Sequence, residues 1–179
     1  MQSFVFPIIT TQRLCLRKFS ESDTEAVYNA FKNGDFTAKM LTEKQTDRIF
    51  AETYIEEMKS EYEKGDCYTW AVALKDCDSC VGAISLNMVN FTNESAELGY
   101  WISPEFMGCG YATESVSAIV RYAFEYMKLH RLSAMCRLDN IASMNVLKKN
   151  GFTIEGIAKE SAKFQNRYVD IASFAIINK

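Results

Sequence analysis

A strand, a glycine loop, a helix and a second strand follow one another between residues 95 and 138. The two strand candidates are SAELGYWIS (95–103) and RLSAMCRL (131–138). The helix pattern follows the loop, and its apolar side chains fall on one stripe: Ala112, Val116, Ile119, Val120, Ala123, Phe124 and Met127. A strand-helix-strand crossover makes its two strands parallel and lays its helix on the sheet. This unit therefore predicts an α/β fold.

Hairpin patterns surround this unit. Alternating apolar residues predict a strand within 10–19, and strands at 68–75, 80–90, 152–159 and 168–177, with short polar connections at 76–79 and 91–94. Helices are predicted after the capping box of Ser20 and Asp23, after Thr46, and over 142–150 before Gly151. The face of the second helix carries Phe50, Tyr54, Met58 and Tyr62. We expect a mixed, mostly antiparallel sheet of about seven strands with about four helices, in one domain over residues 1–179.

Composition narrows the class of protein. Apolar residues make up 48% and charged residues 24% of the chain, a balance typical of a globular domain. A net charge of -3 gives no electrostatic reason to expect nucleic acid. No apolar run is long enough for a bilayer, and no signal-peptide pattern opens the chain, so we expect a cytoplasmic protein without a membrane partner. Cys77 and Cys80 form a lone C-x-x-C within a predicted hairpin, and we expect no metal there.

The loop MGCGYA between the first strand and the helix admits two interpretations. It is a tight turn that needs glycine for a positive φ, or an anion site made by backbone N–H groups at a helix N-terminus. Strand before and helix after is the context that an anion loop requires. Asn140, Ser143 and Asn145 gather at the start of the short helix after the next strand, which places them beside the loop.

With these motifs the chain resembles the GNAT acetyltransferases, and among them the RimJ/RimL-like group that acetylates N-terminal amines of ribosomal proteins. The resemblance rests on TQRLCLR (11–17), AELGYWISPEFMGCGYATESV (96–116), CRLDNIASMNVLKKNGFTIEG (136–156) and YVD (168–170). It implies a GNAT fold whose fourth and fifth strands splay apart, with a bulge in the strand before the loop. It also implies direct acetyl transfer from acetyl-CoA to a primary amine, without a metal, in a protein that forms homodimers.

The resemblance also assigns the cofactor site. Backbone N–H groups from Met107 to Ala112 would hold the pyrophosphate, and Glu105 departs from the family's pattern, so we expect it to face solvent. The strand before the loop would pair with pantetheine, and the Ile102 N–H would polarise the thioester carbonyl. The implied cofactor-binding residues are Tyr100, Trp101, Ile102, Met107, Gly108, Cys109, Gly110, Tyr111, Ala112, Asn140 and Asn145.

Two residues are implied for catalysis. Glu97 matches a glutamate near the acceptor amine and is the candidate base; the alternative is that it lies on the solvent face or pairs with a neighbouring cation. The family's usual acid, a tyrosine seven positions after Asn140, is Leu147 here. Ser143 is the candidate that protonates the departing thiolate, and its alternative is an ordinary cap or first-turn hydroxyl on the short helix.

The acceptor stays open at this point. Two alternatives are enzymes that differ in their acceptor: a protein N-terminal amine, or a small amine such as a polyamine or an antibiotic. The third alternative is a CoA-binding sensor that catalyses no transfer. We expect residues 33–66 to shape the acceptor cleft. Their acidic side chains would suit a cationic acceptor, although a solvated helix face explains them equally well: Asp35, Glu43, Asp47, Glu52, Glu56 and Glu57.

Overall fold

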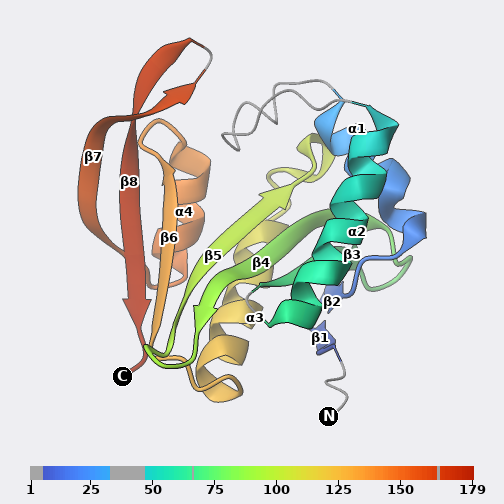
Figure 1. Cartoon of the computed structure of the whole chain (residues 1–179), viewed down its shortest axis with the longest axis horizontal. Helices are drawn as coiled ribbons and strands as arrows, with labels where there is room; N and C mark the ends of the chain where they lie inside the picture. Colours follow the sequence, from blue (N-terminus) through green and yellow to red (C-terminus); the bar gives the residue numbers. More distant parts are fainter. Residues whose placement is uncertain (1–5, 33–46, 66, 165) are drawn as a thin grey trace.

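Eight strands in the described part of the chain form one sheet, in the order β1-β2-β3-β4-β5-β6-β8-β7 (Figure 1). The computed structural model describes residues 6–32, 47–65, 67–164 and 166–179. The strands are β1 (Ile9–Thr10), β2 (Leu14–Arg17), β3 (Tyr68–Leu74), β4 (Cys80–Asn90), β5 (Ser95–Ile102), β6 (Arg131–Arg137), β7 (Thr153–Phe164) and β8 (Arg167–Ile177). The α-helices in these ranges are α1 (Thr24–Phe31), α2 (Arg48–Lys64), α3 (Tyr111–Glu125) and α4 (Ile141–Lys149). None of them is long and apolar enough to cross a bilayer.

The predicted mixed sheet is confirmed, with one strand more than the seven expected. The additional strand is β1, whose two residues are too few to show an alternating pattern. β7 continues to Phe164, past the predicted end at residue 159. Nearly all of β7 is exposed, so its sequence lacks the apolar alternation that marks a half-buried strand.

Among the described strands, β5 and β6 form the single parallel pair, as the crossover through α3 requires. They pair at only three positions, Ser95 with Arg131, Ala96 with Leu132 and Glu97 with Ser133. Beyond these positions the strands diverge (Figure 1), which confirms the expected splay. The expected bulge lies elsewhere: the register shift falls between Asn87 and Asn90 of β4, so β4 and not β5 supplies the extra residue.

Alternation along the strands directs side chains to two cores, one on each face of the sheet. Trp70 and Val72 of β3 join the larger core, to which α3 and α4 contribute residues such as Val116 and Leu147. Ala71, between them, joins the smaller core with α1 and α2. The predicted apolar face of α2 packs there through Phe50, Tyr54 and Met58. Its last member, Tyr62, instead contacts Phe6 with tilted rings and Tyr68 edge-on.

The predicted capping box is present at the start of the first helical segment. The Asp23 carboxylate accepts a hydrogen bond of 2.8 Å from the Ser20 N–H. It also forms two hydrogen bonds with the Arg17 guanidinium, at 2.8 and 2.9 Å, and is 3% exposed. The box opens a short 3-10 turn at Glu21–Asp23 before α1 begins. α2 has its own cap, since the Asp47 carboxylate accepts from the Phe50 N–H.

Candidate functional site

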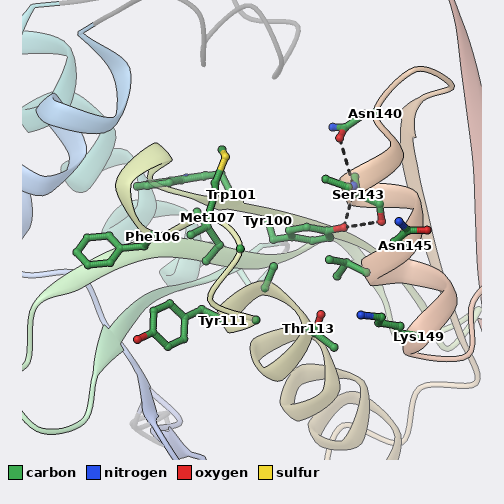
Figure 2. A pocket seen from close by; sticks show the side chains of 16 residues that line it. Tyr100, Trp101, Phe106, Met107, Tyr111, Thr113, Asn140, Ser143, Asn145 and Lys149 are labelled. Atoms are coloured by element: carbon green, nitrogen blue, oxygen red, sulfur yellow. Dashed lines mark hydrogen bonds between the residues drawn. The ribbon is translucent and has the colours of Figure 1, made fainter.

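A pocket of about 370 Å³ opens at the carboxyl end of β5. Its walls are the last residues of β5, the loop after it, the first turn of α3 and one face of α4 (Figure 2). Because β5 and β6 diverge here, the sheet leaves room between two strands that would otherwise be hydrogen-bonded. This is the place where open α/β sheets bind ligands.

Most of the residues implied by the sequence meet in this pocket. Ser143 lines it, together with ten of the implied cofactor-binding residues: Tyr100, Trp101, Ile102, Met107, Gly108, Gly110, Tyr111, Ala112, Asn140 and Asn145. Cys109 and Glu97 do not line it. Glu105 is exposed and outside the pocket, as expected from its charge.

The loop satisfies both interpretations of its glycines. Gly108 and Gly110 have φ of 81° and 82°, in the left-handed region that favours glycine. Gly110 is also the N-cap of α3 and makes no side-chain capping hydrogen bond. The first N–H groups of a helix have no partner within the helix, and here they border the pocket. The same turn that requires glycine therefore presents N–H donors and the positive end of the α3 dipole to the pocket, as an anion site would require.

Arg13 holds this loop from outside the pocket. Its guanidinium donates to the Cys109 carbonyl at 3.0 Å, pairs with Glu114 at 2.7 Å and lies 4.8 Å from the centre of the Tyr111 ring. Thr11 donates to the same Glu114 carboxylate, and these hydrogen bonds hold the Glu114 pKa below its usual value although partial burial opposes them. The Cys109 carbonyl is thus held by Arg13, which directly precedes β2, and neither residue lines the pocket.

Ser143 is hydrogen-bonded in the pocket rather than acting as a cap. The N-cap of α4 is Asn140, whose side-chain oxygen accepts from the Ser143 N–H at 3.2 Å. The Ser143 hydroxyl lies 2.8 Å from the Tyr100 hydroxyl (Figure 2). Burial raises the pKa of Tyr100 to about 12, although the hydrogen bond with Ser143 opposes this effect. Ser143 is therefore not the N-cap but a hydroxyl of the first turn of α4, which agrees with the second part of the structural alternative and leaves its role in the chemistry a prediction.

Leu147 cannot take part in the chemistry of this pocket. Its side chain is 1% exposed, belongs to the larger core and does not line the pocket. The direction of the side chain, as well as its lack of a polar group, excludes this position.

The backbone of β5 directs N–H groups into the splay. The Ser103 N–H donates to the Val81 carbonyl of β4. In an antiparallel pair, successive residues direct their N–H groups to opposite sides. The N–H of Trp101 therefore points toward β4, and those of Tyr100 and Ile102 point toward the gap beside β6. The structure thus gives the Ile102 N–H the orientation that polarising a carbonyl in the pocket would require.

Glu97 lies at the base of the splay, where β5 still pairs with β6. By alternation its side chain shares a face with Trp101, which packs with α1 and α2, and opposes the face of Leu98 and Tyr100. Glu97 is half-buried, and none of the described residues forms an ion pair or hydrogen bond with its carboxylate. It is therefore accessible from the side of the sheet opposite α3 and α4.

Sequence reasoning missed five residues that line the pocket: Phe106, Thr113, Ala142, Val146 and Lys149. On α4 the helical period could have identified them, because Ala142, Val146 and Lys149 lie on the same helix face as Asn145. Lys149 brings a cation to the same pocket as the N-terminus of α3 (Figure 2). The pocket therefore combines backbone N–H donors, a positive charge and apolar walls, which suits a phosphorylated, partly apolar ligand.

The acidic residues expected near an acceptor cleft have other roles where they are described. Asp47 caps α2, and Glu52 and Glu56 are exposed and lie within ion-pair distance of Arg48 and Lys59. Glu57 is exposed as well. Asp35 and Glu43, with the rest of residues 33–46, lie outside the described residues.

Comparisons with known proteins agree with this geometry. Residues 13–153 match the acetyltransferase (GNAT) domain family. The uncharacterized N-acetyltransferase YoaA of Bacillus subtilis is 31% identical over 156 residues, which are 87% of this chain and 88% of that protein. A solved structure described as RimL, a ribosomal L7/L12 alpha-N-protein acetyltransferase in complex with coenzyme A, superimposes with a TM-score of 0.86 at 26% identity, covering 96% of this chain and 98% of the other.

Two further relatives match over about half of their length. The ribosomal-protein-serine acetyltransferase of Escherichia coli is 32% identical over 100 residues, 56% of each chain. The spermidine N(1)-acetyltransferase of Vibrio cholerae is 27% identical over 97 residues, 54% of this chain and 56% of that protein. The two act on different amines, so the shared half of the chain does not distinguish between acceptors.

Proposed function

Since the chain belongs to the GNAT acetyltransferase family, we propose that it transfers the acetyl group of acetyl-CoA directly to the N-terminal α-amine of a protein. The observation that carries this proposal is the pocket at the splay, which brings together the glycine loop at the N-terminus of α3, a cationic side chain and the last residues of β5, beyond their pairing with β6. The ribosomal-protein acetyltransferases among the relatives favour the α-amine. An α-amine is also the easier substrate, because its pKa is about 8 and that of a lysine is about 10.4.

The pocket residues fit acetyl-CoA, which as a thioester supplies an activated acetyl group. The N–H groups of the first turn of α3 would bind the pyrophosphate. Lys149 would neutralise a further phosphate, and Phe106 and Val146 would contact the apolar parts. The Tyr100 and Ile102 N–H groups would donate hydrogen bonds to the ligand, which would lie beside β5 in the place of a neighbouring strand. The Asn140 side-chain oxygen accepts the hydrogen bond from the Ser143 N–H, so the side-chain amide N–H groups of Asn140 would contact a ligand.

The two substrates would reach the site from opposite faces of the sheet. The donor would lie on the face of Tyr100 and α4, and the amine would approach Glu97 from the opposite face. Glu97, through a water molecule, would take the proton from the ammonium so that the neutral nitrogen attacks. The Ile102 N–H would stabilise the oxyanion, a contribution of about 3 to 4 kcal/mol in comparable sites. Ser143 would then donate a hydrogen bond to the departing sulfur.

The spermidine acetyltransferase supports a second candidate, in which the same chemistry acts on a small polyamine. Where described, the acidic residues of α2 face solvent or pair with cations, which makes them weak evidence for a polyamine site.

The test is a transfer assay with labelled acetyl-CoA and a mixed pool of ribosomal-protein N-terminal peptides and polyamines, read by mass spectrometry. We expect label on peptide α-amines, and a kcat at least tenfold lower for Glu97→Gln. Glu94→Gln, an exposed carboxylate three residues earlier, is the control and should keep full activity. Label on polyamines alone would transfer the assignment to the second candidate. Tight CoA binding without transfer to any amine would refute an enzyme and indicate a CoA sensor.

A further inference from the structure

Tyr100 is the one phenol of the pocket wall that contacts Ser143. Its ring projects from β5 toward α4, and its hydroxyl lies 2.8 Å from the Ser143 Oγ and 3.2 Å from the Ser143 carbonyl oxygen (Figure 2). Neither the sequence patterns nor the family resemblance assigns a task to this hydroxyl. The contact joins residues 43 positions apart.

A tyrosine hydroxyl has one hydrogen, and two acceptors lie within its reach. If Tyr100 donates to the carbonyl, its oxygen accepts from Ser143, and the serine hydrogen points away from the ligand. If Tyr100 donates to the serine oxygen, the serine hydrogen is free to point into the pocket. The two arrangements differ only by rotation of two hydroxyl groups, because the heavy-atom distances permit both.

We propose that Tyr100 is a positioning residue that turns the Ser143 hydroxyl toward the CoA sulfur when negative charge develops there. This inference rests on the proposed function of the pocket. During transfer the N–C bond forms and the C–S bond breaks, with the electron pair left on sulfur. Ser143 donates its hydrogen bond to that sulfur while Tyr100 donates to the Ser143 oxygen. The proton lost by the amine and the proton finally gained by the thiolate balance, so neither hydroxyl is consumed.

The surroundings favour hydrogen bonding over proton donation by Tyr100. Burial raises its pKa to about 12, whereas a free thiol has a pKa of about 8.5, so net transfer of the phenol proton to a thiolate is uphill. Cys136 of β6 also contacts Ser143, and burial raises the pKa of its thiol. Both neighbours of Ser143 therefore stay protonated near neutral pH. A chain of neutral donors stabilises an anion without being titrated.

The first test is a double-mutant cycle with Tyr100→Phe and Ser143→Ala. Tyr100→Phe removes the hydroxyl and keeps the ring, so we expect an unchanged KM for acetyl-CoA and a kcat lower by roughly twofold to tenfold, the range for one neutral hydrogen bond. In the Ser143→Ala background the same change should have no further effect. A merely structural hydroxyl would instead lower the activity equally in both backgrounds, or raise KM, and either result would overturn the inference.

The second test needs no acceptor. The pKa of the bound CoA thiol is titrated by its thiolate absorbance, with the desulfo-CoA complex as the blank for the protein's own cysteines. Tyr100→Phe and Ser143→Ala should each raise this pKa, and the double variant should raise it no further. If wild type transfers acetyl groups but Tyr100→Phe changes neither the thiol pKa nor kcat, the inference fails and the proposed function stands. If wild type accepts no amine, the thiol titration still decides the role of Tyr100.

Discussion

The ion pair between Arg17 and Asp23 allows a stability prediction with a built-in control. Arg17 contacts two carboxylates: Asp23 at 2.8 and 2.9 Å, and Asp78 at 2.7 Å. Asp23 is 3% exposed and Asp78 is 69% exposed. The same guanidinium thus forms one buried and one solvent-exposed ion pair, and the two can be removed separately.

We expect Asp23→Ala to cost about 3 to 4 kcal/mol in the free energy of unfolding. Removing one partner of a buried pair typically costs about 3 to 5 kcal/mol. The lower end of this range applies because Arg17 keeps its ion pair with Asp78 and is 15% exposed. The loss of the capping hydrogen bond from the Ser20 N–H adds to the cost. Asp78→Ala should cost about 0.2 to 1 kcal/mol, as exposed pairs do. At about 2 to 4 °C per kcal/mol, Tm should fall by about 6 to 16 °C for Asp23→Ala and by at most about 4 °C for Asp78→Ala.

The assay is urea unfolding followed by circular dichroism, repeated between neutral and acidic pH. Arg17 and the Ser20 N–H hold the pKa of Asp23 below its usual value even though burial opposes them. The carboxylate therefore contributes stability above the unfolded-state pKa of about 3.9, and this contribution is lost as the pH falls through the lower folded-state pKa. The difference between wild type and Asp23→Ala should shrink at acidic pH. Equal losses for the two variants at neutral pH would refute the reasoning from burial.

Three further predictions concern the site and its support. Arg13→Ala should raise the KM for acetyl-CoA severalfold with little change in kcat, because it removes the hydrogen bond from the Arg13 guanidinium to the Cys109 carbonyl of the loop. An unchanged KM in steady-state assays would contradict this. Gly82→Ala should cost about 3 kcal/mol or more in thermal unfolding, because its methyl group would lie 2.2 Å from the Trp101 carbonyl oxygen, and a well-folded variant would show that β5 can move. Leu147→Ala should cost about 2 to 5 kcal/mol by urea unfolding yet leave the relative rates on different amines unchanged; a shift in those rates would place Leu147 at the site after all.

Most of the fold followed from local signals in the sequence. β4 matches its predicted range because a buried strand between two polar turns shows both ends clearly. The long exposed β7 and the short β1 were predicted incompletely or missed, since neither buries an alternating apolar face. The parallel pair could be predicted because one crossover helix admits few topologies.

The site was predictable where a motif is contiguous and not where it depends on tertiary contacts. The loop and the start of α4 lie within short stretches, so most of their pocket residues were found, although Phe106 and Ala142 were missed. Arg13 lies 96 positions before Cys109, and no local pattern connects them. The Tyr100 to Ser143 hydrogen bond also depends on how α4 packs beside β5, which fixes a distance that the sequence does not express.

The divergence of β5 and β6 has a consequence for how this site tolerates mutation. A sheet normally has two edges, and this one has two more inside it, where the main chain of β5 beyond Glu97 has no β6 neighbour. Whatever lies along those inner edges is held by peptide groups, which every residue except proline provides alike. A substitution there changes the side chain and keeps the peptide N–H group, as Tyr100→Phe does. A proline at Tyr100 or Ile102 removes such an N–H donor, so a proline scan would separate what the backbone contributes to ligand binding from what the side chains contribute.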